Sequence, residues 1–322
     1  MYPSVMLRWL LATLLLAVLT ACRSTSIAPV PTSTVRPTSL PAATATTQPT
    51  AHPVTGSIDL SSLTGRIVFS AGPGEHQDIY VINADGSGLT QLTTDPAADF
   101  DPAWSPDGSY IAFRSTRDGQ DEIYVMNADG SGQTILTDGP ETGHSPAWSP
   151  DGKVVFPSSE ESGPSLWVIN ADGSELRRIS EVDGEYPAWS PDGTQIAYDL
   201  PPVSAPDFDI WVTNVDGSGG RLLAGGPTPQ QGPAWSPNGT QIAFQSGLEA
   251  EPRYSHIWIM NADGSGQRRL SQDYGARPVW SPDGRYILFA WNGLYVMRAD
   301  GTGVTRLPIS GLGELTFPDW TQ

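Results

Sequence analysis

Hydrophobic positions in this chain are grouped in short runs that recur about every forty residues. One run reads Ile-x-Phe and recurs at Ile67–Phe69, Ile111–Phe113, Val154–Phe156, Ile196–Tyr198, Ile242–Phe244 and Ile287–Phe289. A second run follows each of them, at Ile79–Asn83, Ile123–Asn127, Leu166–Asn170, Ile210–Asn214, Ile257–Asn261 and Leu294–Arg298. The second runs are apolar on both alternating faces, which is typical of strands in a sheet that is covered on both sides. The pattern therefore predicts short strands in sheets that pack face to face.

Turn residues separate these strands at fixed offsets. A Pro-x-Trp-Ser segment precedes every Ile-x-Phe run except the first, and a similar Pro-x-Trp segment follows the last copy; the tryptophans are Trp104, Trp148, Trp189, Trp235, Trp280 and Trp320. A Ser-Pro-Asp-Gly turn joins it to the next strand in most copies, and Asn-Ala-Asp-Gly follows the second apolar run. Proline, aspartate and glycine at these offsets favour tight hairpins. A repeat of this length, built from four short strands, is typical of a propeller blade, and we expect its tryptophans to pack between blades.

The two ends of the repeat region are complementary. The first copy begins at Gly65-Arg66-Ile67 with no Trp-Ser strand before it, whereas the last ends after Pro318-Asp319-Trp320, a Trp-Ser-type strand with nothing after it. Joining the ends completes six blades and removes two unpaired strand edges. We therefore predict an all-β, six-bladed β-propeller of four-stranded antiparallel blades, closed by the C-terminal strand pairing into blade one. An open solenoid is the alternative, but it leaves the matching deficits unexplained.

The N-terminal part has a different composition. An apolar run from Trp9 to Leu19 follows Arg8, and its last leucine begins Leu-Thr-Ala-Cys, which predicts a secretory signal over residues 1–22. Cys22, the single cysteine, occupies the position that is lipidated in a lipobox; an ordinary signal with an incidental cysteine is the alternative. Residues 23–63 are rich in Pro, Thr and Ser and predict a disordered tether. The propeller is expected to span residues 64–322.

Charge narrows the range of partners. The formal net charge is −18, and nearly all of the acidic residues lie in the repeat region. Such a surface repels nucleic acids and anionic lipids and attracts basic proteins or peptides. The loops that precede the Trp-Ser strands supply a candidate binding rim around the channel: Asp99, Asp101, Glu141, His144, Glu181, Asp183, Glu185, Gln231, Asp273 and Arg277. A merely solvated acidic rim is the alternative.

Catalytic and cofactor signatures are scarce. The sequence has no Gly-x-Ser-x-Gly, no phosphate-binding glycine loop with lysine and no His-Glu-x-x-His, so we predict no cofactor and no catalytic residue. His76, His144 and His256 are expected in exposed loops on one face, but on alternate blades, which argues against a shared metal ion. The Asn-Ala-Asp-Gly loops resemble part of a calcium loop, yet they lack the later bidentate glutamate, so a plain hairpin is favoured.

Residues 65–322 resemble the TolB-type propeller repeat, a relative of the WD repeat. The resemblance is carried by Trp104-Ser-Pro-Asp-Gly, Ile111-Ala-Phe and Ile123-Tyr-Val-Met-Asn-Ala-Asp-Gly, and by their copies. The family includes periplasmic interaction scaffolds, gating propellers of peptidases and some propeller lyases, so fold alone selects no activity. A Pro/Thr tether stands where TolB carries an α/β domain. Together with the predicted signal and lipobox, the resemblance implies an extracytoplasmic, lipid-anchored, monomeric module that binds a protein or peptide. A lyase or hydrolase acting on an envelope or extracellular polysaccharide is the alternative, and a purely structural envelope lipoprotein is a third reading.

Overall fold

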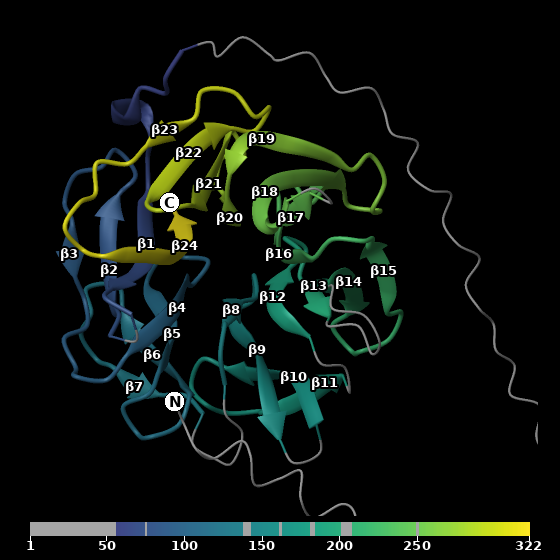
Figure 1. Ribbon diagram of the computed structural model, residues 1–322. Coiled ribbons are helices and arrows are strands. Elements are labelled where there is room, and N and C mark those ends of the chain that lie inside the picture. The colour runs from purple at the N-terminus through teal and green to yellow at the C-terminus, as the bar shows by residue number, and fades with distance from the viewer. Residues whose placement is uncertain are drawn as a thin grey trace, which may run out of the picture. The chain divides into compact units, whose positions relative to one another are not determined.

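Six four-stranded antiparallel sheets are arranged as blades around a common axis (Figure 1). The computed structural model describes residues 56–74, 76–137, 143–160, 163–180, 184–200, 208–248 and 251–322. The signal segment, Cys22 and most of the expected tether lie outside these residues. One short 3-10 helix, η1 (Leu60–Ser62), precedes the first strand. No helix in the described part of the chain is both long and apolar enough to cross a membrane.

The strands follow one another along the chain within each blade, except in blade one. Blade one consists of β24 (Glu314–Thr321), β1 (Arg66–Gly72), β2 (Asp78–Asn83) and β3 (Thr90–Gln91). Blade two consists of β4 (Asp99–Trp104), β5 (Tyr110–Ser115), β6 (Glu122–Asn127) and β7 (Thr134–Ile135). Blade three consists of β8 (Ala147–Trp148), β9 (Lys153–Glu160), β10 (Gly163–Asn170) and β11 (Arg177–Ser180).

The remaining three blades repeat this order. Blade four consists of β12 (Glu185–Trp189), β13 (Gln195–Leu200), β14 (Asp209–Asn214) and β15 (Arg221–Ala224). Blade five consists of β16 (Gln230–Trp235), β17 (Gln241–Leu248), β18 (Glu251–Asn261) and β19 (Arg268–Tyr274). Blade six consists of β20 (Ala276–Trp280), β21 (Tyr286–Ala290), β22 (Leu294–Arg298) and β23 (Thr305–Arg306). Every apolar run lies in the second or third strand of a blade, so the prediction of the fold is confirmed.

The hydrophobic core is divided among the interfaces between blades. Six clusters of buried side chains pack there, and each contains or contacts one tryptophan of the repeat. The middle strands supply fully buried residues such as Phe69, Phe113 and Phe289. Phe69 stacks on Tyr80, its partner across the β1–β2 pair, with ring centroids 5.9 Å apart. The expected role of the tryptophans as inter-blade core is thus confirmed.

Side-chain hydrogen bonds fix the repeated turns. In the first Ser-Pro-Asp-Gly turn, the Ser105 hydroxyl donates to Asp107 at 2.7 Å and accepts from the backbone N–H of Tyr110 at 2.9 Å. In the first Asn-Ala-Asp-Gly loop, Asp85 accepts from both the hydroxyl and the backbone N–H of Ser87. These bonds lower the pKa of Asp85 and of Asp107 below the ordinary carboxyl value. Both sequences therefore form the hairpins that the pattern predicts.

The C-terminal strand β24 closes the ring by pairing with β1. Arg66, Ile67 and Val68 lie opposite Thr321, Trp320 and Asp319 in an antiparallel register. Asp319 also accepts the backbone N–H of Trp104 in blade two at 2.7 Å, although the equivalent residue of the other inner strands is Ala or Val. The chain's last strand is therefore bonded to two blades.

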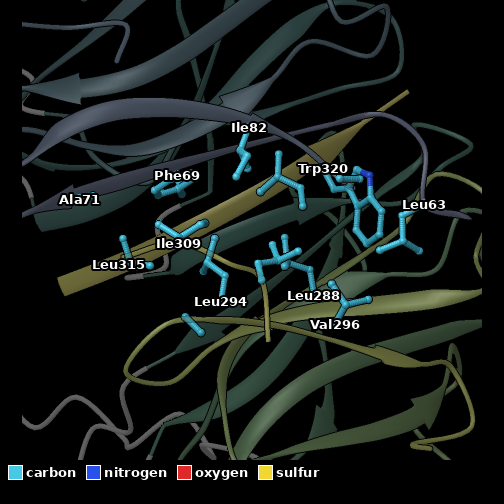
Figure 2. Close-up of a cluster of buried hydrophobic side chains, with 14 of the residues drawn as sticks. Leu63, Phe69, Ala71, Ile82, Leu288, Leu294, Val296, Ile309, Leu315 and Trp320 are labelled. Atoms are coloured by element: carbon cyan, nitrogen blue, oxygen red, sulfur yellow. The ribbon is translucent and has the colours of Figure 1, made fainter. Parts of the chain in front are cut away.

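The seam between blades one and six holds the largest buried cluster. Figure 2 shows its members Leu63, Phe69, Ala71, Ile82, Leu288, Leu294, Val296, Ile309, Leu315 and Trp320. Ile58 and Leu63 belong to this cluster and are 4% and 6% exposed, and the Ile58 N–H donates to Thr305 at 2.8 Å. Residues 56–63 are thus packed against the propeller, whereas the composition places them in the tether. The few apolar side chains of this segment are enough to hold it in place because they are buried against the seam between blades one and six.

Candidate binding site in the central channel

A cavity of about 700 Å³ runs along the axis of the propeller. Its walls are the inner strands β24, β4, β8, β12, β16 and β20, which all contribute the same segment of the repeat. Prolines, tryptophans and alanines make up most of this wall, and its charged members are Asp101, Arg277 and Asp319. The cavity is therefore mainly apolar, with a few charges at defined places.

The residue before the first proline of each inner strand has a left-handed backbone. These residues form a ring at one level of the channel: Asp101, Ser145, Tyr186, Gly232, Arg277 and Phe317, with φ between 44° and 61°. The antiparallel register is interrupted at this place in five blades. Such a backbone is unfavourable for residues with a Cβ, so the repeated bulge imposes it. We call this set the channel ring.

Three members of the channel ring meet across the axis. Tyr186 and Phe317 come from opposite blades, four and one, and their rings stack with centroids 6.4 Å apart. The Arg277 guanidinium carbon lies 3.2 Å from the centroid of the Tyr186 ring and 4.8 Å from that of Phe317. Burial raises the pKa of Tyr186, while the charge of Arg277 acts in the opposite direction. We call Tyr186, Arg277 and Phe317 the channel cluster.

A buried carboxyl group lies behind the channel cluster. Asp199, on β13 opposite Glu185, is fully buried, and neither of its oxygens accepts a hydrogen bond of ordinary geometry. Burial raises the pKa of Asp199 to about 8, Arg277 opposes that shift, and Glu185 adds to it. Asp199 therefore holds a proton at neutral pH.

Asp199 is expected to make the protein less stable as the pH rises. Its carboxyl binds a proton in the folded state up to about pH 8 but only up to about pH 4 in the unfolded chain, so stability is lost across that window. We expect Asp199→Asn to remove this contribution to the pH dependence of the free energy of unfolding. Between about pH 5 and about pH 9, the variant should therefore lose less stability than the wild type. Urea unfolding at both pH values measures the difference. Parallel curves for the two proteins would contradict the assignment.

Two members of the predicted binding rim are buried rather than solvated. The Asp99 side chain has no exposed surface and pairs with Arg117 at 3.1 Å. Asp101 is 6% exposed and accepts the backbone N–H and the hydroxyl of Ser145, each at 3.2 Å. Both acids lie on β4, whose neighbours supply arginine and serine donors, so they hold the structure together instead of facing a partner.

The structure separates the other predicted rim residues. Glu141, Glu181 and Asp183 lie outside the described residues. Asp273 is exposed, Glu185 and His144 are half-buried, and Arg277 belongs to the channel cluster. Gln231 accepts from the side chain of Gln245 at 3.4 Å. The described members do not form one continuous acidic surface.

The three histidines of the repeat region differ in environment. His76 is exposed and His144 is half-buried, but His256 is only 3% exposed and lies against Tyr274, with ring centroids 5.1 Å apart. Exposed loop positions were expected for all three. Within the described residues, no group of three His, Cys, Asp or Glu side chains is placed to hold a metal ion.

An aromatic patch, which the sequence does not reveal, lies between blades five and six. Tyr254 and Tyr274 stack with centroids 4.6 Å apart, and Trp291 lies 6.0 Å from the first and 5.1 Å from the second. Tyr254 remains 44% exposed. Tyr254 lies in β18, Tyr274 ends β19 and Trp291 follows β21. Ala290 pairs with Ala276, the neighbour of Arg277, so Tyr274 and Trp291 lie at the end of their blades that carries the channel ring. The three aromatic residues occupy different positions within their copies of the repeat, so no sequence motif identifies them.

Comparisons with known proteins agree with this architecture. Residues 62–199 match the family described as Tricorn protease N-terminal beta propeller domain, and residues 186–321 match the TolB beta propeller domain. A protein named Protein TolB homolog from Chlorobaculum tepidum is 31% identical over 119 residues, which are 37% of this chain and only 27% of that relative.

Two solved structures show the same fold. TolB from Acinetobacter baumannii is 22% identical with a TM-score of 0.70, covering 82% of this chain and 67% of its own. A putative TolB from Agrobacterium tumefaciens is also 22% identical with a TM-score of 0.62, covering 76% and 89%. The six-fold repeat, the ring closed by β24 and these matches together support a propeller of the TolB type.

Proposed function

We propose that this protein is an extracytoplasmic, membrane-tethered module that binds a basic protein or peptide on the face that carries the channel ring. Its family relatives include proteins named Tol-Pal system protein TolB, which supports a role in protein interaction. The predicted signal segment and lipidation of Cys22 would hold the propeller at a membrane, with the Pro/Thr-rich segment as a spacer.

The aromatic patch carries this proposal. Tyr and Trp are enriched among the residues that contribute most to protein interfaces, because they bury a large area with few rotatable bonds. Tyr254 exposes almost half of its surface although it is stacked on Tyr274. A rigid, exposed aromatic group is the arrangement that a partner can cover.

Charge indicates the kind of partner. The chain has a formal net charge of −18, and the exposed Asp273 adjoins Tyr274 in the patch. An arginine or lysine side chain of a partner can lie over an exposed aromatic ring and pair with a nearby carboxylate at the same time. The patch therefore favours a basic segment over an acidic one.

Replacing Tyr254 by alanine is expected to weaken partner capture at least about tenfold, as loss of an aromatic anchor does in other interfaces. Tyr110→Ala is the matched control, because Tyr110 is 45% exposed but begins β5 beside the turn at the other end of its blade. Crosslinking in the native envelope, followed by mass spectrometry, measures capture for each variant. Equal recovery with both variants would refute the patch as the binding site.

A further inference from the structure

We propose that the central channel binds a molecule that combines an apolar body with a carboxylate, and that Arg277 is the residue that pairs with the carboxylate. This site lies inside the propeller and goes beyond the surface interaction proposed above. The two sites use different residues, so an experiment can refute either proposal without refuting the other.

The guanidinium of Arg277 packs against two aromatic rings and has one nitrogen atom without a partner. Its face lies against the Tyr186 ring at 3.2 Å, and Phe317 lies 4.8 Å from the same carbon. The backbone N–H of Arg277 donates to Gln245 at 2.8 Å, which anchors the residue. Its Nη1 atom is buried and has no hydrogen-bond partner. A guanidinium that is stacked on its face and keeps one unpaired N–H group is prepared to donate a charge-assisted hydrogen bond to a carboxylate.

The positive charge of Arg277 is not cancelled by an ion pair. No ion pair among the described residues includes it, and it is the only basic residue among those that line the cavity. Asp101 is engaged by Ser145 instead. Asp199 carries a raised pKa and is neutral at physiological pH, so it leaves the charge of Arg277 available. A half-buried cation that belongs to no ion pair among the described residues favours an anionic ligand.

The rest of the cavity suits an apolar body. Repeated prolines, alanines and tryptophans form its wall, and its volume of about 700 Å³ is within the range of small-molecule sites. Pro106, Pro150 and Pro191 line its other end and are exposed, so the cavity reaches the surface there. A ligand that enters at this end would place its apolar part among the tryptophans and its carboxylate at Arg277.

The tryptophans in the wall provide a direct assay. Hydrocinnamate and its neutral amide have the same apolar body and differ in charge, so their titration against the full-length protein, followed by tryptophan fluorescence, isolates the carboxylate. We expect the acid to bind at least about tenfold more tightly, as a charge-assisted pair requires. Equal binding of the two compounds, or no binding of either, would overturn the proposal.

Variants of two arginines test the assignment to Arg277. Arg277→Gln is expected to abolish the preference for the acid, and Arg277→Lys to retain part of it because lysine keeps the charge but lacks the planar fork. Arg285→Gln is the control, since Arg285 is 67% exposed and pairs with Asp283 outside the channel. Circular dichroism of each variant reports its folding. An unchanged preference in a folded Arg277→Gln protein would refute the role of Arg277.

The ligand class has two natural sources, a free organic acid and the C-terminus of a peptide. A tetrapeptide Ala-Ala-Pro-Phe with a free C-terminus, compared with the same peptide amidated, separates them in the same assay. If the free peptide binds more tightly than the amidated one and this preference depends on Arg277, the site binds peptide C-termini. If only hydrocinnamate shows the Arg277-dependent preference, the site binds small organic acids. Both results support a carboxylate site.

Discussion

Deleting Phe317–Gln322 is expected to unfold the propeller or to lower its melting temperature by more than about 10 °C. The deletion removes the residues opposite Arg66, Ile67 and Val68, and it exposes the edge of β1. It also removes Trp320, which is 6% exposed; loss of a buried tryptophan side chain alone costs about 3–5 kcal/mol. Since a domain is stable by only about 5–15 kcal/mol, this loss is a large fraction of the total.

Thermal unfolding followed by circular dichroism measures the effect of the deletion. Removal of Gln322 alone is the control, because this residue is exposed and lies beyond β24. We expect the control to melt with the wild type. If the longer deletion also melted with the wild type, pairing of β24 with β1 would not be what closes the ring.

Gly65→Ala is expected to destabilise the same seam by roughly 3 kcal/mol, from steric overpacking and an unfavourable backbone together. Gly65 has φ of +94°, and a Cβ built on it would lie 2.0 Å from the carbonyl oxygen of Thr321. That oxygen belongs to the backbone of β24, so it can move only if the strand pairing is disturbed. Chemical denaturation of the two proteins gives the difference in free energy of unfolding.

Gly152→Ala is the matched control for this substitution. Gly152 also has a positive φ, +85°, but a Cβ added to it would meet no atom within 4 Å. Its cost should be the backbone strain alone, about 1 kcal/mol. A similar loss in both variants would mean that the approach of β24 to Gly65 does not contribute to stability.

The fold could be predicted because its determinants are local and repeated. Alternation such as that of Ile123–Asn127 specifies a doubly covered strand, and Ser-Pro-Asp-Gly specifies the hairpin that precedes it. Ring closure followed from the two incomplete copies, and the register of β24 with β1 confirms it.

The candidate site could be predicted only in part, because its chemistry depends on contacts between blades. Asp99 looks like a loop acid in the sequence, but Arg117 lies 18 positions away and neutralises it only in the fold. The channel cluster joins blades four, six and one, so no short motif contains it. Alignment of the six copies would have identified its members, since each occupies the position before the repeated proline.

Pairing of the first strand with the last also determines when folding can finish. Ser70 of β1 lies opposite Thr316, 246 positions later, so the partner of β1 is synthesised long after β1 itself. Contacts between distant parts of a chain slow folding because a long loop must close first. The edge of β1 therefore stays unpaired, and open to association with other chains, until β24 is available to pair with it.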